Sequence, residues 1–425
     1  MENNSSKLPV SAQSEQAILL AEEQLQSVFS GIQKIEQANQ WKVLSAFQEE
    51  GIASRHFAAT TGYGYDDIAR DTLDCVFARA FCAEDALVRP QMVNGTHAIY
   101  LALSGLLRPG DTLLSITGKP YDTLRDAICS PDDSNLGALS EFGIQYAEIP
   151  LEADGSIALS RVMETLEKDK RIRVVYAQRS RGYAWREAIT IETMKQVFAA
   201  VKHVRKDVWI VVDNCYGEFT CLEEPTQAGA DIIAGSLIKN PGGGLAPTGG
   251  YVAGKANAVA QIANRMTIPG MGREVGSYAA SYQPYYQGLF MAPHTTAESL
   301  KTAILFARVL ENAGMETMPQ SEAPRSDIIQ ALRLPDAKTL IAFCQSIQKA
   351  APIDSFVVPE PWEMPGYQCP VIMAAGAFVQ GASIELSADA PIKEPYTAYV
   401  QGSLTYAHGR IGAMMALDAL HASAR

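Results

Sequence analysis

Residues 208–254 constrain the possible fold more than any other part of the chain. They begin with a short apolar run, residues 208–212, which ends in Asp213. A second apolar run, residues 231–237, leads to Lys239, which is followed by Asn, Pro and three glycines. Short, wholly apolar runs are typical of strands buried on both faces of a sheet, and the Pro-Gly segment cannot continue a helix or a strand. We therefore expect two neighbouring strands that deliver an acid and an amine to the same cleft.

A carboxylate and a lysine in one cleft suit pyridoxal phosphate (PLP). This cofactor needs a lysine amine to form a Schiff base, and it needs an acid that keeps the pyridinium nitrogen protonated. Asp213 and Lys239 are the candidates for these two roles. The alternative is an ordinary strand-end pair in a loop, because an isolated lysine is usually solvated.

The wider sequence favours the cofactor. The segments VVDN, AGADI, Ser236-Leu-Ile-Lys239 and GGGLAPTGG resemble those of the cystathionine and methionine lyases of Cys/Met metabolism. Within that superfamily the chain looks most similar to the aluminium-resistance branch, through GYGY at residues 62–65 and His-Gly-Arg at residues 408–410. The resemblance implies an α/β fold, the fold-type I PLP-dependent transferase (aspartate-aminotransferase-like) fold. Lys239 would be its Schiff-base residue. A nucleotide site is disfavoured, since residues 242–247 lack the third glycine of G-x-G-x-x-G.

Alternating apolar runs and helical segments fill residues 87–254 and predict a mostly parallel sheet with helices on both faces. A polar, turn-rich connection near residue 315 marks a boundary before a smaller α+β domain. We expect an N-terminal helical arm over residues 1–60, a large PLP-binding domain over 61–315 and a small C-terminal domain over 316–425. The 425 residues are 47% hydrophobic, enough for two cores.

The phosphate of the cofactor has a candidate site at Asn94-Gly95-Thr96. This turn follows a predicted strand and opens a helix, where unpaired backbone N–H groups and the helix dipole both favour an anion. The related lyases use the backbone of a similar turn as their phosphate cup. The resemblance thus implies that Gly95 and Thr96 bind the phosphate, with Ser236 as a second donor.

Tyr121 follows the predicted strand at residues 112–117. Its place in the order of strand, turn and aromatic residue matches the tyrosine that lies flat on the PLP ring in the lyase family. Such a ring can hold the cofactor by stacking, and its hydroxyl can serve in proton transfer. A purely structural role for Tyr121 stays open.

The GYGYDDIAR segment corresponds by position to the part of the family that reaches the PLP phosphate of a partner subunit. Tyr63 or Tyr65 can supply the hydroxyl. The family's arginine is missing two residues later, and Arg70, one helical turn on, is a weak substitute. An ordinary turn before a helix is the alternative.

Two arginines are candidates for binding carboxylates. Arg181 belongs to a group of three arginines near a predicted strand end, and we assign it to the cofactor or to the substrate carboxylate. A solvated or interface cluster is the alternative. The R-[LI]-S segment that supplies the substrate arginine in the family is absent, so Arg410 is the late arginine available for this role.

Composition narrows the partners. A net charge of −12 disfavours nucleic acid and anionic membranes. The seven cysteines are scattered without a C-x-x-C pair, so neither a metal site nor a disulfide framework is expected. The polar start does not resemble a signal peptide, and there is no apolar run of eighteen residues. We therefore expect a cytoplasmic protein.

The resemblance implies a PLP-dependent carbon–sulfur lyase that acts on sulfur amino acids by β- or γ-elimination, like methionine gamma-lyase or cystathionine lyase. The first chemical steps are shared with transamination, so an aminotransferase is an alternative. A non-catalytic or regulatory PLP-fold protein linked to aluminium tolerance is another. The family also implies an amino-acid substrate and a homodimer or homotetramer with shared active sites.

Overall fold

The structure is a computed structural model that describes residues 10–129, 137–364 and 369–423. By its internal contacts the chain divides into two compact units. The large unit contains residues 35–296 and 325–327, and the small unit contains the remaining segments. The arm expected over residues 1–60 is thus divided between the units, and its first nine residues lie outside the described part of the chain.

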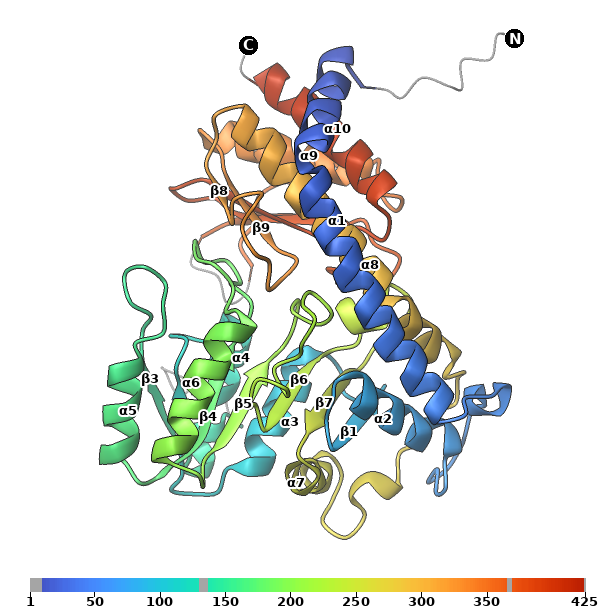
Figure 1. The fold of residues 1–425 in the computed structure, drawn as a ribbon, viewed down its shortest axis with the longest axis vertical. Helices are drawn as coiled ribbons and strands as arrows, with labels where there is room; N and C mark the ends of the chain where they lie inside the picture. Colours follow the sequence, from blue (N-terminus) through green and yellow to red (C-terminus); the bar gives the residue numbers. More distant parts are fainter. Residues whose placement is uncertain (1–9, 130–136, 365–368, 424–425) are drawn as a thin grey trace. The chain divides into compact units, whose positions relative to one another are not determined.

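The large unit is built on a seven-stranded sheet within the described residues, in the order β1-β7-β6-β5-β4-β2-β3 (Figure 1). The strands are β1 (Asp85–Arg89), β2 (Thr112–Ser115), β3 (Gln145–Glu148), β4 (Ile172–Gln178), β5 (Trp209–Asp213), β6 (Ile232–Ser236) and β7 (Gly250–Gly254). Strands β3, β2, β4, β5 and β6 are parallel, while β7 is antiparallel to both β6 and β1. The predicted α/β architecture with a mostly parallel sheet is confirmed.

Helices cover both faces of this sheet, as the alternation of apolar runs predicted. They are α2 (Ile68–Ala80), α3 (Gly95–Leu106), α4 (Asp122–Ile128), α5 (Leu159–Lys168), α6 (Ile191–Val204) and α7 (Ala256–Met266). Apolar residues of α2, α5 and α6 share one core, and those of α3, α4 and α7 share the other. Because successive strand residues point to opposite faces, Ile210 and Val212 of β5 enter the first core and Val211 enters the second.

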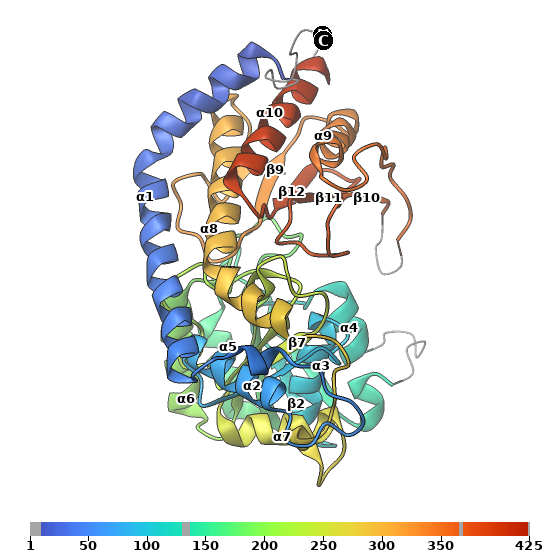
Figure 2. The ribbon, with the colours of Figure 1, turned by 90° about the vertical axis from the view of Figure 1, so that its right-hand side faces the viewer.

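Two long helices have parts in both units. Helix α1 (Ala12–Glu49) is a single helix of 38 residues where the sequence predicted one or two (Figure 2). The sequence predicts a long helix over about residues 296–314, whereas helix α8 (Gln283–Asn312) begins well before that. Its early part was missed because it contains Pro293, and an internal proline removes a helical hydrogen bond and argues against a helix.

The small unit holds a five-stranded antiparallel sheet within the described residues, in the order β10-β11-β12-β9-β8. Its strands are β8 (Thr317–Met318), β9 (Gln330–Arg333), β10 (Val371–Ala374), β11 (Ser387–Pro391) and β12 (Thr397–Gln401). Its helices are α9 (Ala337–Ala350) and α10 (Tyr406–Ser423), together with parts of α1 and α8. The sequence predicts a terminal helix over residues 396–424 that is interrupted around Gly402. The interruption is correct, since Gly402 adopts a φ of 75°, but the part before it is wrong, because it forms β12.

The small unit joins segments from the start and the end of the chain. Ser11 donates its hydroxyl to Asp418 Oδ1 at 2.6 Å, across 407 residues of sequence. Ser14 donates to the same oxygen at 2.7 Å. Among the described residues, no helix has both the length and the apolarity needed to cross a membrane.

Candidate active site

The carboxyl ends of β5 and β6 bring Asp213 and Lys239 to one edge of the large unit's sheet. Asp213 is the last residue of β5, and its neighbour β6 ends at Ser236. The chain then turns, with the Lys239 N–H donating to the Ser236 carbonyl at 3.4 Å. Parallel neighbouring strands end at the same edge of a sheet, so Asp213 and Lys239 both follow strand ends at this edge.

Asp213 is a buried carboxyl with few partners. One oxygen accepts the Cys215 backbone N–H at 3.0 Å, and the other accepts the Tyr176 hydroxyl at 3.5 Å. Burial raises the pKa of Asp213, and the positive charge of Lys239 partly offsets this effect. A cationic group near the carboxyl would therefore stabilise its ionised form.

Lys239 is partly buried, and its ammonium lies over an aromatic ring. Its Nζ is 3.9 Å from the ring centroid of Tyr216, a distance typical of a cation–π contact. Tyr216 has a φ of 69°, which is uncommon for a residue other than glycine. Tyr216 is not among the site residues predicted from the sequence. Its position three residues after Asp213, on the same strand-end turn, was the signal that could have identified it.

The Gly95 turn lies against Ser236. Helix α3 begins at Gly95, and Asn94 caps it by accepting the His97 N–H at 2.9 Å. A Cβ at position 95 would lie 3.0 Å from the Ser236 Cβ and 3.3 Å from Cys215 Sγ. The helix start and the end of β6 therefore approach as closely as a glycine allows, and Gly95 and Ser236 line one small region.

Tyr121 lies beside the same turn. Its hydroxyl donates to the Thr96 hydroxyl at 2.9 Å, and its backbone N–H donates to Gln178 Oε1 at 3.1 Å. Burial, and then the negative charge of Asp213, raise the pKa of Tyr121. The phenol therefore keeps its proton at neutral pH. Tyr121 and Thr96 thus form a hydrogen-bonded pair at the start of α3.

Tyr63 and Tyr65 differ from Tyr121 in being exposed. Their side chains are 68% and 56% accessible, and their rings stack with centroids 5.6 Å apart. Arg70 is fully buried and donates to the Gly64 carbonyl at 2.8 Å while it pairs with Asp71 at 2.8 Å. Arg70 thus holds the loop that carries the two tyrosines, and its contacts give it a structural task.

The two candidate carboxylate-binding arginines lie in different units. Arg181 is buried in the large unit, 3.5 Å from the carboxylate of Asp327. Arg410 belongs to α10 in the small unit and pairs with Glu22 at 2.9 Å. Each has an acidic partner within its own unit, and the binding roles expected of both stay predictions.

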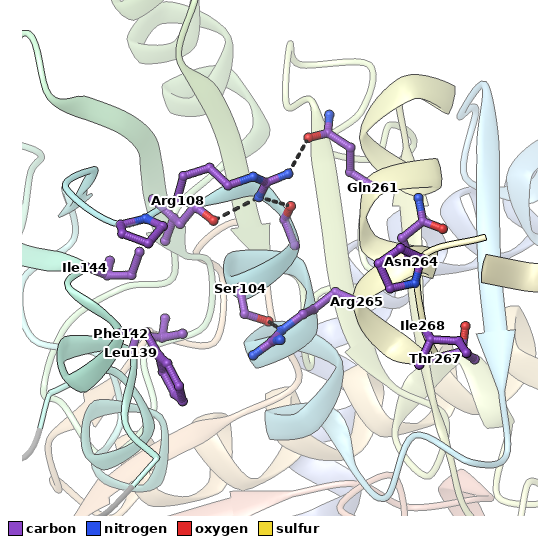
Figure 3. A pocket seen from close by; sticks show the side chains of 14 residues that line it. Ser104, Arg108, Leu139, Phe142, Ile144, Gln261, Asn264, Arg265, Thr267 and Ile268 are labelled. Atoms are coloured by element: carbon purple, nitrogen blue, oxygen red, sulfur yellow. Dashed lines mark hydrogen bonds between the residues drawn. The ribbon is translucent and has the colours of Figure 1, made fainter. Parts of the chain in front are cut away.

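A pocket of about 550 Å³ lies elsewhere on the large unit (Figure 3). It is lined by the C-terminal part of α3, the end of α7 and residues near Phe142, with Arg108 and Arg265 at its sides. Helix α3 has 12 residues and is about 18 Å long, so this pocket is at the far end of the helix from Gly95. None of the residues that line it belongs to the predicted site.

Comparison with known proteins identifies the relatives of this chain. The family model for methionine gamma-lyase matches residues 14–421. The chain belongs to the methionine gamma-lyase family. A crystal structure from Clostridium novyi NT, described as a carbon-sulfur lyase involved in aluminum resistance, is 51% identical, with 96% of each chain covered and a TM-score of 0.93. A proposed cystathionine beta-lyase involved in aluminum resistance, from Clostridium acetobutylicum, is 48% identical, with 98% of each chain covered and a TM-score of 0.94.

A third similar protein is named only as uncharacterized. The uncharacterized protein YnbB of Bacillus subtilis is 48% identical over 399 residues, which cover 94% of both chains. A more distant likeness shows the fold alone: the pyridoxal-5'-phosphate dependent protein YhfS of Escherichia coli is 16% identical, with 92% of this chain and 97% of that chain covered and a TM-score of 0.62. The predicted resemblance to the Cys/Met lyases and the fold-type I architecture are both confirmed.

Proposed function

We propose that this protein is a PLP-dependent carbon–sulfur lyase that acts on sulfur amino acids by β- or γ-elimination. The observation that carries the proposal is the meeting of Asp213 and Lys239 at the ends of adjacent strands in a chain of the methionine gamma-lyase family. Solved relatives described as carbon–sulfur lyases support the same reaction class.

The residues at this edge fit PLP. Lys239 would hold the cofactor through Nζ, and Asp213 would face the ring nitrogen, where the cation would keep the buried carboxyl ionised. The approach of Gly95 to Ser236 would crowd a Cβ at this position. The backbone N–H groups at the start of α3 are suited to bind a phosphate. When bound, PLP supplies an electron sink for the carbon that loses its proton.

The protein's own groups would move the protons. Lys239, once freed by the substrate amine, would take the α-proton at Nζ. Breaking the carbon–sulfur bond leaves the electron pair on sulfur, which needs a proton to depart as a thiol. Tyr121 keeps its hydroxyl proton at neutral pH and is held by Thr96, so it is suited to pass a proton at this edge. The cytoplasmic location and the arginine for the substrate carboxylate stay predictions from the sequence.

Absorption and product analysis test the proposal. The purified protein should be yellow with PLP, and Lys239→Ala should lose both the colour and the activity. The wild type should release a thiol from L-cystathionine or L-methionine, or hydrogen sulfide from L-cysteine, together with ammonia and a 2-oxo acid in equal amounts. A protein that does not become yellow when PLP is added would contradict the proposal. A 2-oxo acid formed without ammonia, and only with an amino acceptor present, would point to an aminotransferase. Colour without any turnover would point to a regulatory protein.

A further inference from the structure

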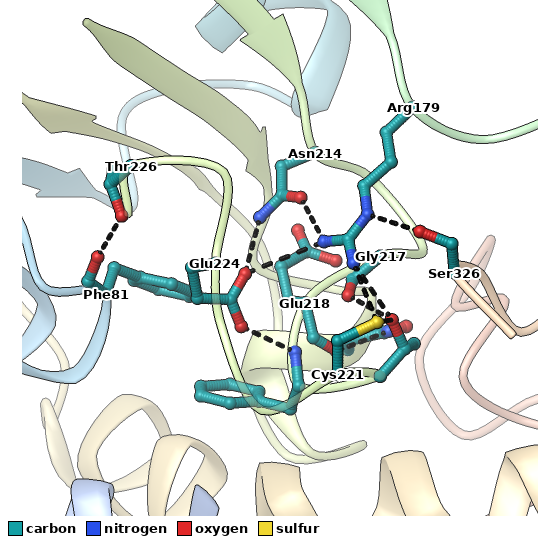
Figure 4. Close-up of polar contacts among 12 residues, drawn as sticks. Phe81, Arg179, Asn214, Gly217, Glu218, Cys221, Glu224, Thr226 and Ser326 are labelled. Carbon is teal, nitrogen blue, oxygen red and sulfur yellow. Dashed lines mark hydrogen bonds and ion pairs between the residues drawn. The ribbon is translucent and has the colours of Figure 1, made fainter. Parts of the chain in front are cut away.

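A buried polar cluster surrounds Asn214, the residue that follows Asp213 at the end of β5 (Figure 4). Arg179, which follows β4, donates to Asn214 Oδ1 at 2.8 Å and lies 3.7 Å from the Glu224 carboxylate. Asn214 in turn donates to Glu224 at 3.2 Å. Glu218 completes the cluster, and all four side chains are fully buried. Burying polar and charged groups in this way costs folding free energy unless the groups pair with one another.

Hydrogen bonds in this cluster join the two halves of the candidate active site. Asn214, the residue after Asp213, donates to the Tyr251 hydroxyl at 3.4 Å. Tyr251 donates its own proton to Glu218 Oε1 at 2.8 Å. Asn240, the residue after Lys239, donates its side-chain amide to the backbone carbonyl of Glu218 at 3.0 Å. A chain of buried contacts therefore runs from one strand end to the other through Glu218.

Glu218 is packed tightly at the centre of this chain. A Cβ at Gly235, on β6, would lie 2.7 Å from Glu218 Oε1 and 3.0 Å from the Tyr251 hydroxyl oxygen. Only a glycine at position 235 leaves space for this pair. The Glu218 side chain is therefore closely confined against β6. Its contact with Tyr251 leads to Asn214 after β5, and its backbone carbonyl holds Asn240 after Lys239.

The surroundings of Glu218 do not compensate a negative charge. Its Oε2 is buried and has no hydrogen-bond partner, and no cation of the described residues forms an ion pair with it. Arg179, the buried arginine of this cluster, is engaged by Asn214 and Glu224. An ionised carboxylate here would be an unpaired charge beside a second acid, which proteins avoid by keeping the group protonated.

We propose that Glu218 is a neutral carboxylic acid at physiological pH and is the positioning residue that couples the Asp213 strand end to the Lys239 turn. The coupling runs through Tyr251 and Asn214 on one side and Asn240 on the other. The catalytic part of this inference rests on the proposed PLP chemistry, whereas the protonation of Glu218 does not.

The titration of Glu218 agrees with this geometry. Burial raises the pKa of Glu218 to about 8, and the charge of Glu224 adds to the rise. Its own backbone, the hydrogen bond from Tyr251 and the positive charge of Lys239 act in the opposite direction. The group should therefore lose its proton near the upper end of the physiological range.

Infrared spectroscopy tests the protonation directly. The purified full-length protein at pH 6.5 should show the carbonyl band of a protonated carboxylic acid, shifted in D₂O and absent from Glu218→Gln. The matched control is Glu223→Gln, five residues along the same loop, where the carboxylate is 41% exposed and pairs with Lys195. The control should keep the band. The band should fade as the pH rises through about 8. A wild-type spectrum without the band at pH 6.5 would overturn the proposal whatever the activity.

Kinetics test the positioning role. Gln has the shape of the neutral acid and can accept a hydrogen bond from Tyr251, so Glu218→Gln should keep kcat within about threefold of wild type. In the wild type, activity should fall at high pH as Glu218 ionises, and Glu218→Gln should not show this fall. Glu218→Ala and Tyr251→Phe should lower kcat by about tenfold to a hundredfold, because a small displacement of catalytic groups has an effect of this size. Both variants should also shift the absorption maximum of bound PLP. Their KM should change little. If Glu218→Ala does not fold, Tyr251→Phe carries the test.

The outcomes separate the two proposals. Should Glu218→Gln be as impaired as Glu218→Ala, or should Tyr251→Phe leave kcat and the spectrum unchanged in an active enzyme, the positioning role is wrong. Should Lys239→Ala keep its colour and activity, the proposed function fails, and the infrared result still decides the state of Glu218.

Discussion

The ammonium of Lys239 lies 3.9 Å from the ring centroid of Tyr216, and the backbone of Tyr216 adopts a φ of 69° to allow it. A ring face so placed stabilises the charged form of the lysine and therefore raises its pKa. The charged amine cannot attack a carbonyl group. Tyr216 thus holds Lys239 in place while it lowers the fraction that can react at neutral pH.

Replacing this ring should change how fast Lys239 takes up PLP. Tyr216→Leu removes the cation–π contact, so the pKa of Lys239 should fall and more of the amine should be free at pH 7. A contact worth about 1 kcal/mol corresponds to about a fivefold faster uptake, which stopped-flow absorbance can measure in protein stripped of PLP. Tyr216→Phe keeps the ring face and should behave like the wild type. Equal rates for Leu and Phe would show that the ring face has no such effect.

The contact between Gly95 and Ser236 predicts an effect on cofactor affinity. Gly95→Ala places a Cβ 3.0 Å from the Ser236 Cβ, so the turn or the strand end must shift. Overpacking of this kind costs roughly 1–3 kcal/mol, and we expect PLP to bind about tenfold more weakly in a fluorescence titration.

Two matched variants separate crowding from a general effect of the substitution. Cys215→Ala in the Gly95→Ala background removes the Sγ atom that lies 3.3 Å from the added Cβ and should restore part of the affinity. Gly31→Ala, at a glycine of α1 with no atom within 4 Å of the added Cβ, should leave the affinity unchanged. Unchanged affinity in Gly95→Ala would contradict a phosphate cradle at this turn.

Shared active sites predict complementation between inactive proteins. We propose that the exposed pair Tyr63 and Tyr65 reaches the cofactor of a partner subunit, as the position of GYGY in the family implies. Tyr63→Phe/Tyr65→Phe and Lys239→Ala should each be inactive. When equal amounts are unfolded together and reassembled, half of the dimers are hybrids with one intact site, so activity should return to about a quarter of the wild-type value. No recovery, or an active monomer in ultracentrifugation, would refute sharing.

The neutral state of Glu218 predicts an unusual dependence of stability on pH. In the folded protein its pKa is about 8, against an ordinary value of 4.5, so between these values the folded state binds one proton more than the unfolded state. The contribution of this group to the free energy of unfolding is therefore present at low pH and lost as the pH rises, by about 1.4 kcal/mol per pH unit.

Chemical denaturation can measure this dependence. Glu218→Gln cannot titrate at this position, so the stability of the wild type relative to the variant should fall by roughly 2–3 kcal/mol between pH 5.5 and 7.5. Glu223→Gln, which removes an exposed carboxyl of the same loop, is the control for the change of residue type. Parallel stability profiles for wild type and Glu218→Gln would mean that Glu218 is ionised in the folded protein.

Local pattern was enough to predict the strand ends. The apolar runs before Asp213 and Lys239 are short and uninterrupted, and strands β5 and β6 form there. The local pattern did not predict β7. Gly250–Gly254 is short and glycine-rich, and it forms a strand because it pairs with β1 and β6 on its two sides. It also began the last helix too early, since residues 397–401 become a strand through pairing with β9 and β11.

Other features could not be predicted because they depend on contacts between residues that are distant in the sequence. Glu218 looks like an ordinary turn acid until Tyr251, 33 residues later, is found 2.8 Å from it. Arg70 matched the family's phosphate arginine only loosely, and its buried contacts with Gly64 and Asp71 give it another task. No periodicity in the sequence encodes such pairs, because they arise when the strands of the sheet come together.

The bond between Ser11 and Asp418 has a consequence for biosynthesis. A ribosome that adds about 5–20 residues per second needs roughly 20–80 s to make the 407 residues that separate them. Until then the first turns of α1, with Ile18, Ala21 and Leu25 on their apolar stripe, lack the last helix of the unit to which they belong. The small unit therefore cannot be completed until α10 has been synthesised, and the nascent chain must keep its earliest helix soluble until then.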